Sequence, residues 1–247
     1  MDKDRKYPVR ESAPPKPRRV YKAVGVGQGE GGAYTVLLDG KTALTPSRAS
    51  LASTSHPLAE AVAAEWNAQD PHVDPETMPL TRLLATQIDR IAPQREGVIA
   101  SLLTYVDADT LCFRAQHPTD LRERQQRQWQ PALDWLEREH GIALVSTEGL
   151  MPPKQAPDTS LRIRRSLEQL NDTQLTAFQA AASLASSLAL SFALIHRHLS
   201  AADVFTAAFL DELYQVEKWG EDELARDRRQ RIAGDLQAIE RYLDLSA

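Results

Sequence analysis

The stretch that decides the fold of this chain reads Glu65-Trp66-Asn67-Ala68-Gln69, then, after a short polar break, Met78-Pro79-Leu80-Thr81-Arg82-Leu83 and Thr86-Gln87-Ile88-Asp89-Arg90. We expect one helix to end near Gln69 and another to start near Thr81, with a proline-punctuated link between them. The stretch holds no nucleophile beside a base, no metal-ligand spacing and no phosphate-binding loop. A Trp, a Met and uncharged polar side chains around two helix ends favour a surface that holds a partner.

On the N-terminal side of this stretch the pattern is typical of short strands. Apolar residues mark three runs, which are Val20–Val26, Tyr34–Leu38 and Thr42–Leu44. Asp39-Gly40 lies between the second and third runs and predicts a two-residue hairpin turn. The glycines at 25, 27, 29, 31 and 32 precede a strand. A dinucleotide-binding fingerprint would have to open a helix, so these glycines predict a hairpin loop.

On the C-terminal side helices dominate. Ser55 and Pro57 predict the start of a first helix that continues to Trp66. Further helices are predicted over 94–106, over 121–140 with a kink or break at Pro131, and from Ser160 to the end with breaks near Leu170-Asn171 and Leu199-Ser200. Short strand-like pieces are Leu111–Arg114 and Ile142–Val145.

Together these elements predict an α+β fold with a small β-rich N-terminal domain and a larger helical bundle. We place a disordered tail at 1–19, the β-rich domain at 20–65 and the mainly helical domain at 66–247. The opening stretch then forms the junction, with Trp66 and Leu80 in the core rather than in contact with a partner.

Composition excludes several functions. The net charge of −5 gives no support for nucleic-acid or anionic-membrane binding. The single cysteine, Cys112, forms no intrachain disulfide and is expected to be a buried small hydrophobe. His196 and His198 are two residues apart, so they point in different directions and predict no metal site.

Prolines in the basic tail argue against a cleavable presequence. We therefore expect a cytoplasmic protein in a bacterium, or a mitochondrial matrix protein in a eukaryote.

No charged residue occurs between Asp172 and His196, and by length alone this stretch could span a bilayer. Its many Ser, Gln, Thr and Ala residues instead favour a central helix of a soluble bundle, without stable membrane insertion. A membrane-attached adaptor that uses 173–195 is the alternative.

A second unusual segment runs from Asp211 to Asp222. A helical stripe is predicted through Phe205, Phe209, Leu213, Val216, Gly220 and Leu224, with Gly220 inside the helix. Glu212 and Trp219 share the flank beside this stripe. Glu212 is either in an ion pair, for example with an arginine of the 121–140 helix, or a partner-facing carboxylate framed by an aromatic ring. The charge run from Arg226 to Arg231 predicts a solvated face.

An ordered series of short motifs resembles the assembly chaperones of the F-type ATP synthase that attend its alpha subunit. The resemblance covers roughly 34–243. Its motifs are Asp39-Gly40-Lys41 before Thr45-Pro46, Glu65-Trp66 with Gln69, Met78-Pro79-Leu80-Thr81 with Asp89, Tyr105 before Asp109-Thr110-Leu111-Cys112-Phe113-Arg114-Ala115, Gln128-Trp129 with Pro131 and Trp135, Gln155, and Glu212 with Gln215, Trp219 and Gly220.

The resemblance implies an ATP-independent chaperone, not an enzyme, that binds the free alpha subunit and prevents its aggregation before assembly. It implies no cofactor and no metal, and we expect a monomer. The family's important C-terminal glutamate is carried to Glu212, with Glu217 as the alternative. The predicted partner-binding residues are Glu212, Gln215, Glu217 and Trp219. One departure is that 223–227 contains no His where family members commonly have one. The competing hypothesis is an enzyme that pairs the carboxylates of Glu212 and Glu65.

Overall fold

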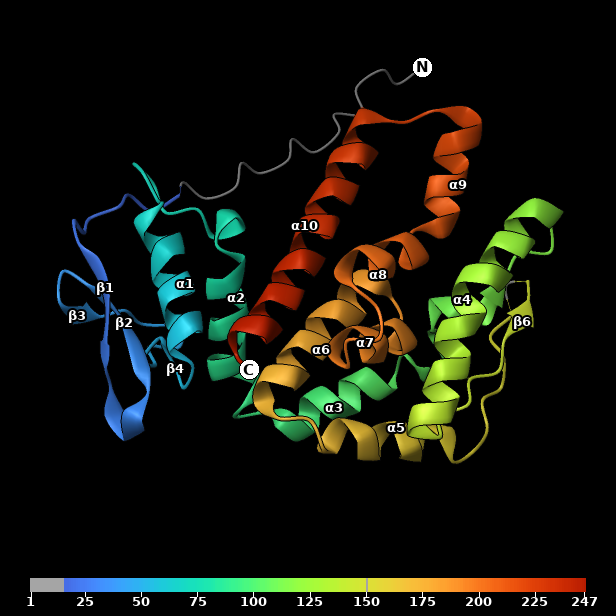
Figure 1. Cartoon of the computed structure of the whole chain (residues 1–247), viewed down its shortest axis with the longest axis horizontal. Coiled ribbons are helices and arrows are strands. Elements are labelled where there is room, and N and C mark those ends of the chain that lie inside the picture. Colours follow the sequence, from blue (N-terminus) through green and yellow to red (C-terminus); the bar gives the residue numbers. More distant parts are fainter. Residues whose placement is uncertain (1–15, 150) are drawn as a thin grey trace, which may run out of the picture.

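The structure is a computed structural model and describes residues 16–149 and 151–247. A small sheet with the helices α1 and α2 lies at one end of the molecule (Figure 1). The long helix α10 lies next to α2, and the other helices form a larger body beyond α10. The predicted α+β class is confirmed. The predicted tail at 1–19 falls mostly on residues 1–15, outside the described residues. The division into domains stays a prediction.

The sheet is antiparallel, with β2 between β1 and β3 and with β4 also paired to β2. Its strands are β1 (Val24–Gln28), β2 (Tyr34–Leu38), β3 (Lys41–Thr42) and β4 (Ala52–Ser53). The predicted turn at Asp39-Gly40 is confirmed, because both residues have positive φ, 50° and 77°. The glycine-rich segment forms the β1–β2 hairpin as predicted, with a short 3-10 helix at Glu30–Gly32 as its loop. The first strand begins at Val24, four residues after its predicted start at Val20.

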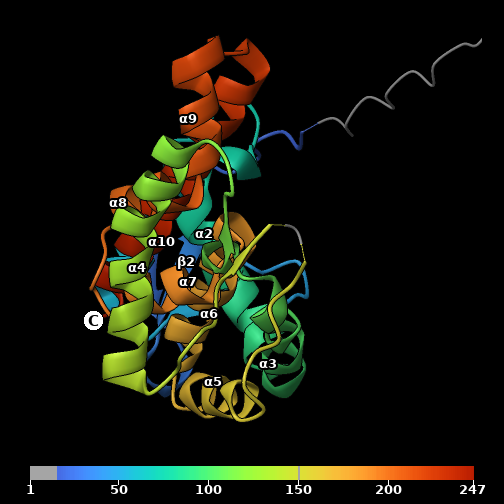
Figure 2. The ribbon, with the colours of Figure 1, turned by 90° about the vertical axis from the view of Figure 1, so that its right-hand side faces the viewer.

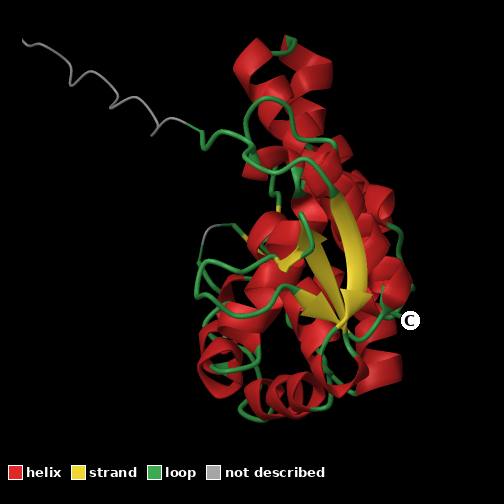
Figure 3. Ribbon diagram, turned by 90° about the vertical axis from the view of Figure 1, so that its left-hand side faces the viewer, coloured by secondary structure: helices red, strands yellow, loops and turns green. Residues whose placement is uncertain are grey.

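The first of two helices covers one face of this sheet and the second packs against the first, and Figure 3 shows the strands in front of helices. They are α1 (His56–Asn67) and α2 (Pro79–Thr86). The predicted cap is confirmed, since the Ser55 side chain accepts from the Leu58 amide. Leu80 is fully buried between sheet and helices, and Trp66 packs partly buried against the same cluster. Tyr242, near the C-terminal end of the chain, also belongs to this cluster and joins it to the helical body.

Eight α-helices and a two-stranded parallel ladder are the main elements of the rest of the described chain, and the links between helices hold 3-10 turns at Pro75–Thr77, Val106–Ala108 and Thr110–Cys112 and a π-helix at Gln87–Ile91. The main elements are α3 (Arg95–Leu103), β5 (Phe113–Arg114), α4 (Thr119–His140), β6 (Thr147–Glu148), α5 (Thr159–Glu168), α6 (Asp172–Ala185), α7 (Leu188–Ile195), α8 (Ala201–Ala208), α9 (Leu210–Trp219) and α10 (Glu223–Leu245). The strand predicted at Ile142–Val145 is wrong, because the ladder forms two residues later. The helix α4 runs unbroken across Pro131.

The uncharged stretch from Asp172 to His196 is two helices rather than one. Ser186 has a φ of 50° and ends α6, and Ser187 caps α7 by accepting from the Leu190 amide. All eight residues of α7 are buried in the large core. Across the described residues, no helix combines the length and the apolar character needed to cross a membrane.

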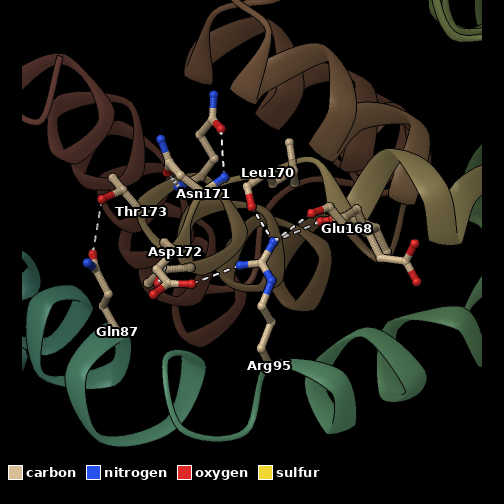
Figure 4. A network of polar contacts seen from close by, with 10 residues as sticks. Gln87, Arg95, Glu168, Leu170, Asn171, Asp172 and Thr173 are labelled. Carbon is tan, nitrogen blue, oxygen red and sulfur yellow. Dashed lines mark hydrogen bonds and ion pairs between the residues drawn. The ribbon is translucent and has the colours of Figure 1, made fainter.

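The predicted break near Leu170-Asn171 is confirmed, and Figure 4 shows how it is held. Asn171 and Gln174 form a capping box at the start of α6. Arg95 of α3 donates to the carboxylate of Asp172 at 2.8 Å, and also to carbonyl oxygens at the end of α5, including that of Leu170. One arginine therefore satisfies carbonyl groups at the C-terminus of α5 and pairs with the carboxylate in the first turn of α6. A second capping box, at Ser200, confirms the other predicted break.

Candidate functional site

The predicted site lies on a projecting part of the molecule that we call the arm, defined as α9 together with the start of α10 up to Arg231. Figure 2 shows α9 and this part of α10 standing out from the other helices. Gly220 ends α9 with a φ of 89°, which favours glycine, and Asp222 caps α10 by accepting from the Ala225 amide at 2.9 Å. The prediction of one helical stripe with Gly220 inside it is therefore wrong: three helices cover this region.

The arm is fastened to α4 mainly through polar contacts. Only Leu210 and Tyr214 of α9 are buried. The Tyr214 hydroxyl donates to the carboxylate of Asp120 at 2.9 Å, and this bond lowers the pKa of Asp120. Arg124 of α4 pairs with Glu217 at 2.7 Å. Exposed ion pairs of this kind contribute about 0–1 kcal/mol each, so α9 is held more weakly than the core helices.

Glu212 faces the opposite side of the arm and joins α9 to α10. Its carboxylate lies 3.1 Å from Arg228 and 3.4 Å from Arg229. Arg229 also pairs with Glu221 at 2.6 Å, and this bond raises the pKa of Arg229. The side chain of Arg229 is only 7% exposed, so this residue departs from the predicted solvated face at 226–231, whose other residues are exposed. Glu212 is therefore in an ion pair, as one of the two alternatives predicted, but its arginines lie on α10; the arginine of α4 pairs with Glu217.

A hollow of about 460 Å³ opens between α9 and α10 at the tip of the arm. It is lined by Glu212, Gln215, Val216, Trp219, Gly220, Asp222, Ala225 and Arg229. Trp219 is 77% exposed, and Leu224 nearby in the chain is 78% exposed. An exposed aromatic ring above paired charges offers apolar area together with fixed hydrogen-bonding groups, which suits binding to another protein.

Three of the four predicted residues line this hollow, whereas Glu217 faces α4. Sequence reasoning missed Arg228 and Arg229, the groups that hold Glu212. Their contact depends on the reversal of the chain at Gly220. The sequence signal for this reversal is Gly220, a residue type that ends helices, followed two residues later by Asp222, a residue type that caps the start of the next helix.

Glu65 and Glu212 do not form a carboxylate pair. Glu65 accepts from the amides of Leu80 and Thr81, both at 2.8 Å, and from the Thr81 hydroxyl at 2.7 Å. It therefore caps α2 from the neighbouring helix. Burial raises the pKa of Glu65, and the three hydrogen bonds, which stabilise the ionised carboxylate, only partly offset this rise. The two glutamates have separate partners on separate elements, so the paired-carboxylate hypothesis is wrong.

The remaining candidate residues have structural surroundings. Cys112 is fully buried, as predicted, and burial raises the pKa of its thiol to about 12. His198 stacks on Trp135 with ring centroids 4.5 Å apart, and His196 lies beside His140 at the same separation. Among the described residues, no group of three or more His, Cys, Asp or Glu side chains is placed to hold a metal ion.

Comparison with known proteins agrees with this geometry. The family model described as ATP12 chaperone protein matches residues 18–137. The crystal structure of Atp12 from Paracoccus denitrificans is 34% identical, with a TM-score of 0.86 over 94% of this chain and 99% of that one. The Atu1473 protein of Agrobacterium tumefaciens is 35% identical, with a TM-score of 0.86 over 92% of this chain and 85% of that one. The mitochondrial protein atp12 of Schizosaccharomyces pombe is 27% identical over 236 residues, which cover 90% of this chain and 81% of the yeast protein.

These relatives place the chain in a class of assembly chaperones rather than enzymes. The chain belongs to the ATP12 family of ATP synthase assembly chaperones.

Proposed function

We propose that this chaperone binds the unassembled alpha subunit of the F-type ATP synthase, prevents its aggregation and delivers it for assembly without using ATP. The observation that carries the proposal is the exposure of Trp219 and Leu224 on an arm fastened by ion pairs. A free subunit exposes apolar surface that its neighbours later cover, and such surface drives aggregation. An exposed tryptophan beside fixed charges can cover part of that surface.

The contacting residues are proposed to be Glu212, Gln215, Glu217 and Trp219. Glu212 and Gln215 line the hollow at the tip, and Glu217 lies on the side that faces α4. Charged groups at such an interface give orientation and register more than net affinity. The aromatic ring supplies most of the apolar contact area.

Independence of ATP is supported by the glycine-rich segment at 25–32, which forms a β-hairpin rather than opening a helix. We also propose that the chaperone acts as a monomer. We place it in the bacterial cytoplasm, or in the mitochondrial matrix of a eukaryote, as the name of the yeast relative suggests.

The test is suppression of light scattering by unassembled alpha subunit, at an equimolar ratio and without ATP. Trp219→Ala should weaken the complex by about 2–4 kcal/mol, which is about 30-fold or more in affinity, because central aromatic residues dominate such interfaces. Leu161→Ala is the matched control, since Leu161 is also an exposed apolar residue but lies on α5. Full activity of Trp219→Ala, or equal protection of any unfolded protein, overturns the proposal.

Two conservative variants separate the candidate glutamates. Glu212→Gln and Glu217→Gln keep the side-chain shape and remove one charge each. We expect Glu212→Gln to impair protection of the alpha subunit more than Glu217→Gln, with unchanged circular dichroism for both. The opposite order assigns the principal role to Glu217.

A further inference from the structure

A second concave surface runs between α2 and α10, which lie side by side in the helical layer (Figure 1). It consists of two hollows, of about 630 Å³ and about 310 Å³, that share Pro79, Arg82 and Asp235 in their linings. Arg82 of α2 and Asp235 of α10 form an ion pair of 2.7 Å where the hollows meet. We call this surface the α2–α10 groove.

Gly234 of α10 lines the groove and is not explained by the chaperone's own packing. It lies in the interior of a long helix, where glycine is less favourable than alanine by about 1 kcal/mol. A Cβ atom added at Gly234 would meet no heavy atom within 4 Å, and its φ is not positive. Gly220, in contrast, has a φ of 89° that favours glycine. The free chain thus carries a costly glycine over open space, which is the arrangement that lets another molecule approach a helix backbone closely.

The larger hollow is lined by three arginines and two acidic residues, so its lining is less acidic than the chain as a whole. Arg228 and Arg231 line the larger hollow, although the protein has a net charge of −5. Arg231 donates to the Asp227 carbonyl at 3.4 Å and forms no ion pair within residues 16–149 and 151–247. Asp235 is neutralised by Arg82, and Glu76 is the other acidic group in the lining. A carboxylate from another molecule would find there the guanidinium of Arg231, which pairs with no acidic side chain of the described residues.

The smaller hollow adds apolar walls. Leu83 of α2, Ala180 and Leu184 of α6, and Ile239 of α10 line it. All the walls are helices, whose backbone groups are already hydrogen-bonded, so recognition must use side chains rather than strand addition. The groove therefore suits a segment in which a carboxylate stands close to apolar side chains.

We propose that the α2–α10 groove is a second docking surface for the client subunit and takes a segment of it that carries a carboxylate beside apolar side chains. This inference rests on the proposed function. Arg228 connects the two surfaces, because it contacts Glu212 at 3.1 Å in the arm and also lines the groove. The client-binding face then extends from Trp219 at the tip of the arm along α10 to α6.

The test is the affinity of the full chain for unassembled alpha subunit in three variants. Gly234→Gln fills the groove while improving helix propensity, so its melting temperature should not fall, yet client affinity should drop about tenfold or more. Gly97→Gln is the matched control, because Gly97 of α3 also has open space around it and does not line the groove. Arg231→Glu should weaken binding and reduce its dependence on salt.

Binding of Gly234→Gln and Arg231→Glu at the wild-type affinity overturns the groove proposal. Absence of binding by the wild-type protein overturns the proposed function itself, so the two failures are distinguishable. If Gly97→Gln weakens binding as much as Gly234→Gln does, the loss reflects general effects of the substitution, and the groove proposal also falls.

Discussion

Removal of the Asp109 carboxylate tests how the buried helix α7 is held. Asp109 is fully buried and lies about 80 residues before the helix that it caps. Its carboxylate accepts from the amides of Leu188 at 2.7 Å and Ala189 at 3.0 Å, and also from that of Leu111 at 3.0 Å. The first two amides open α7, and the third opens the 3-10 helix Thr110–Cys112, whose N-cap is Asp109 itself, so one side chain caps two helices.

The magnitude follows from these three bonds. Asp109→Ala leaves three buried N–H groups without an acceptor, at about 1–3 kcal/mol each. The substitution also removes the cost of burying the carboxylate, a cost that shows in its raised pKa, and this gain offsets part of the loss. We expect a net loss of about 3–5 kcal/mol, from a total stability of about 5–15 kcal/mol. For a chain of this size the melting temperature should fall by about 6–20 °C.

The assay is urea unfolding followed by circular dichroism. Asp109→Asn should lose about half as much, because one amide oxygen remains as an acceptor while the amide nitrogen faces other donors. Asp107→Ala is the control, since Asp107 is an exposed neighbour and should change stability by less than about 0.5 kcal/mol. If Asp109→Ala is no less stable than Asp107→Ala, the capping argument is refuted.

Three further predictions concern stability. Burial lowers the pKa of His140, so folding stability should decline as the pH falls through the unfolded value of about 6.5 toward the folded pKa. His140→Phe should flatten this decline in urea titrations from about pH 7 to 5, and an unchanged slope would assign it to other groups. Glu65→Gln should cost about 1–2 kcal/mol in urea unfolding, because one amide oxygen replaces two acceptors at the start of α2; wild-type stability would contradict this role. Gly40→Ala should cost about 1 kcal/mol in thermal unfolding because its φ is 77°, whereas Gly25→Ala, at a position without positive φ, should not.

Features fixed by neighbouring residues were predictable from the sequence. The turn at Asp39-Gly40 needs two residues that accept positive φ, and these two residue types supply them. The start of α1 is set by the side chain of Ser55, which reaches an amide three residues ahead. Leu80 was placed in the core correctly because its apolar neighbours recur at helical spacing. In each case the chemistry that decides the structure lies within a few residues.

Features fixed across the fold were not predictable in the same way. Ser186 and Ser187 fit an uninterrupted helix by composition, and the break between α6 and α7 is stabilised by Asp109, a distant residue. The arginines that pair with Glu212 are brought to it by the reversal of the chain at Gly220. The sequence pattern places Gly220 inside a helix and so does not predict this reversal. Once α9 and α10 fold back on each other, Arg229 is brought under the carboxylate and is buried. Its surroundings cannot be deduced from a run of charges.

The way the arm is attached bears on how a chaperone both holds and releases its client. Two buried side chains, Leu210 and Tyr214, connect α9 to the core, and its other contacts are mostly partly exposed ion pairs worth about 0–1 kcal/mol each. Displacement of the arm therefore costs little compared with unfolding of the body. A cation of a client can pair with Glu212, which is partly exposed, while the buried Arg229 keeps its ion pair with Glu221 at 2.6 Å, so neither charge is left buried and unpaired. If the arm is the client interface, as we propose, such exchangeable pairs around Trp219 give orientation without very tight binding, and a protein that must pass its client to an assembling complex requires that balance.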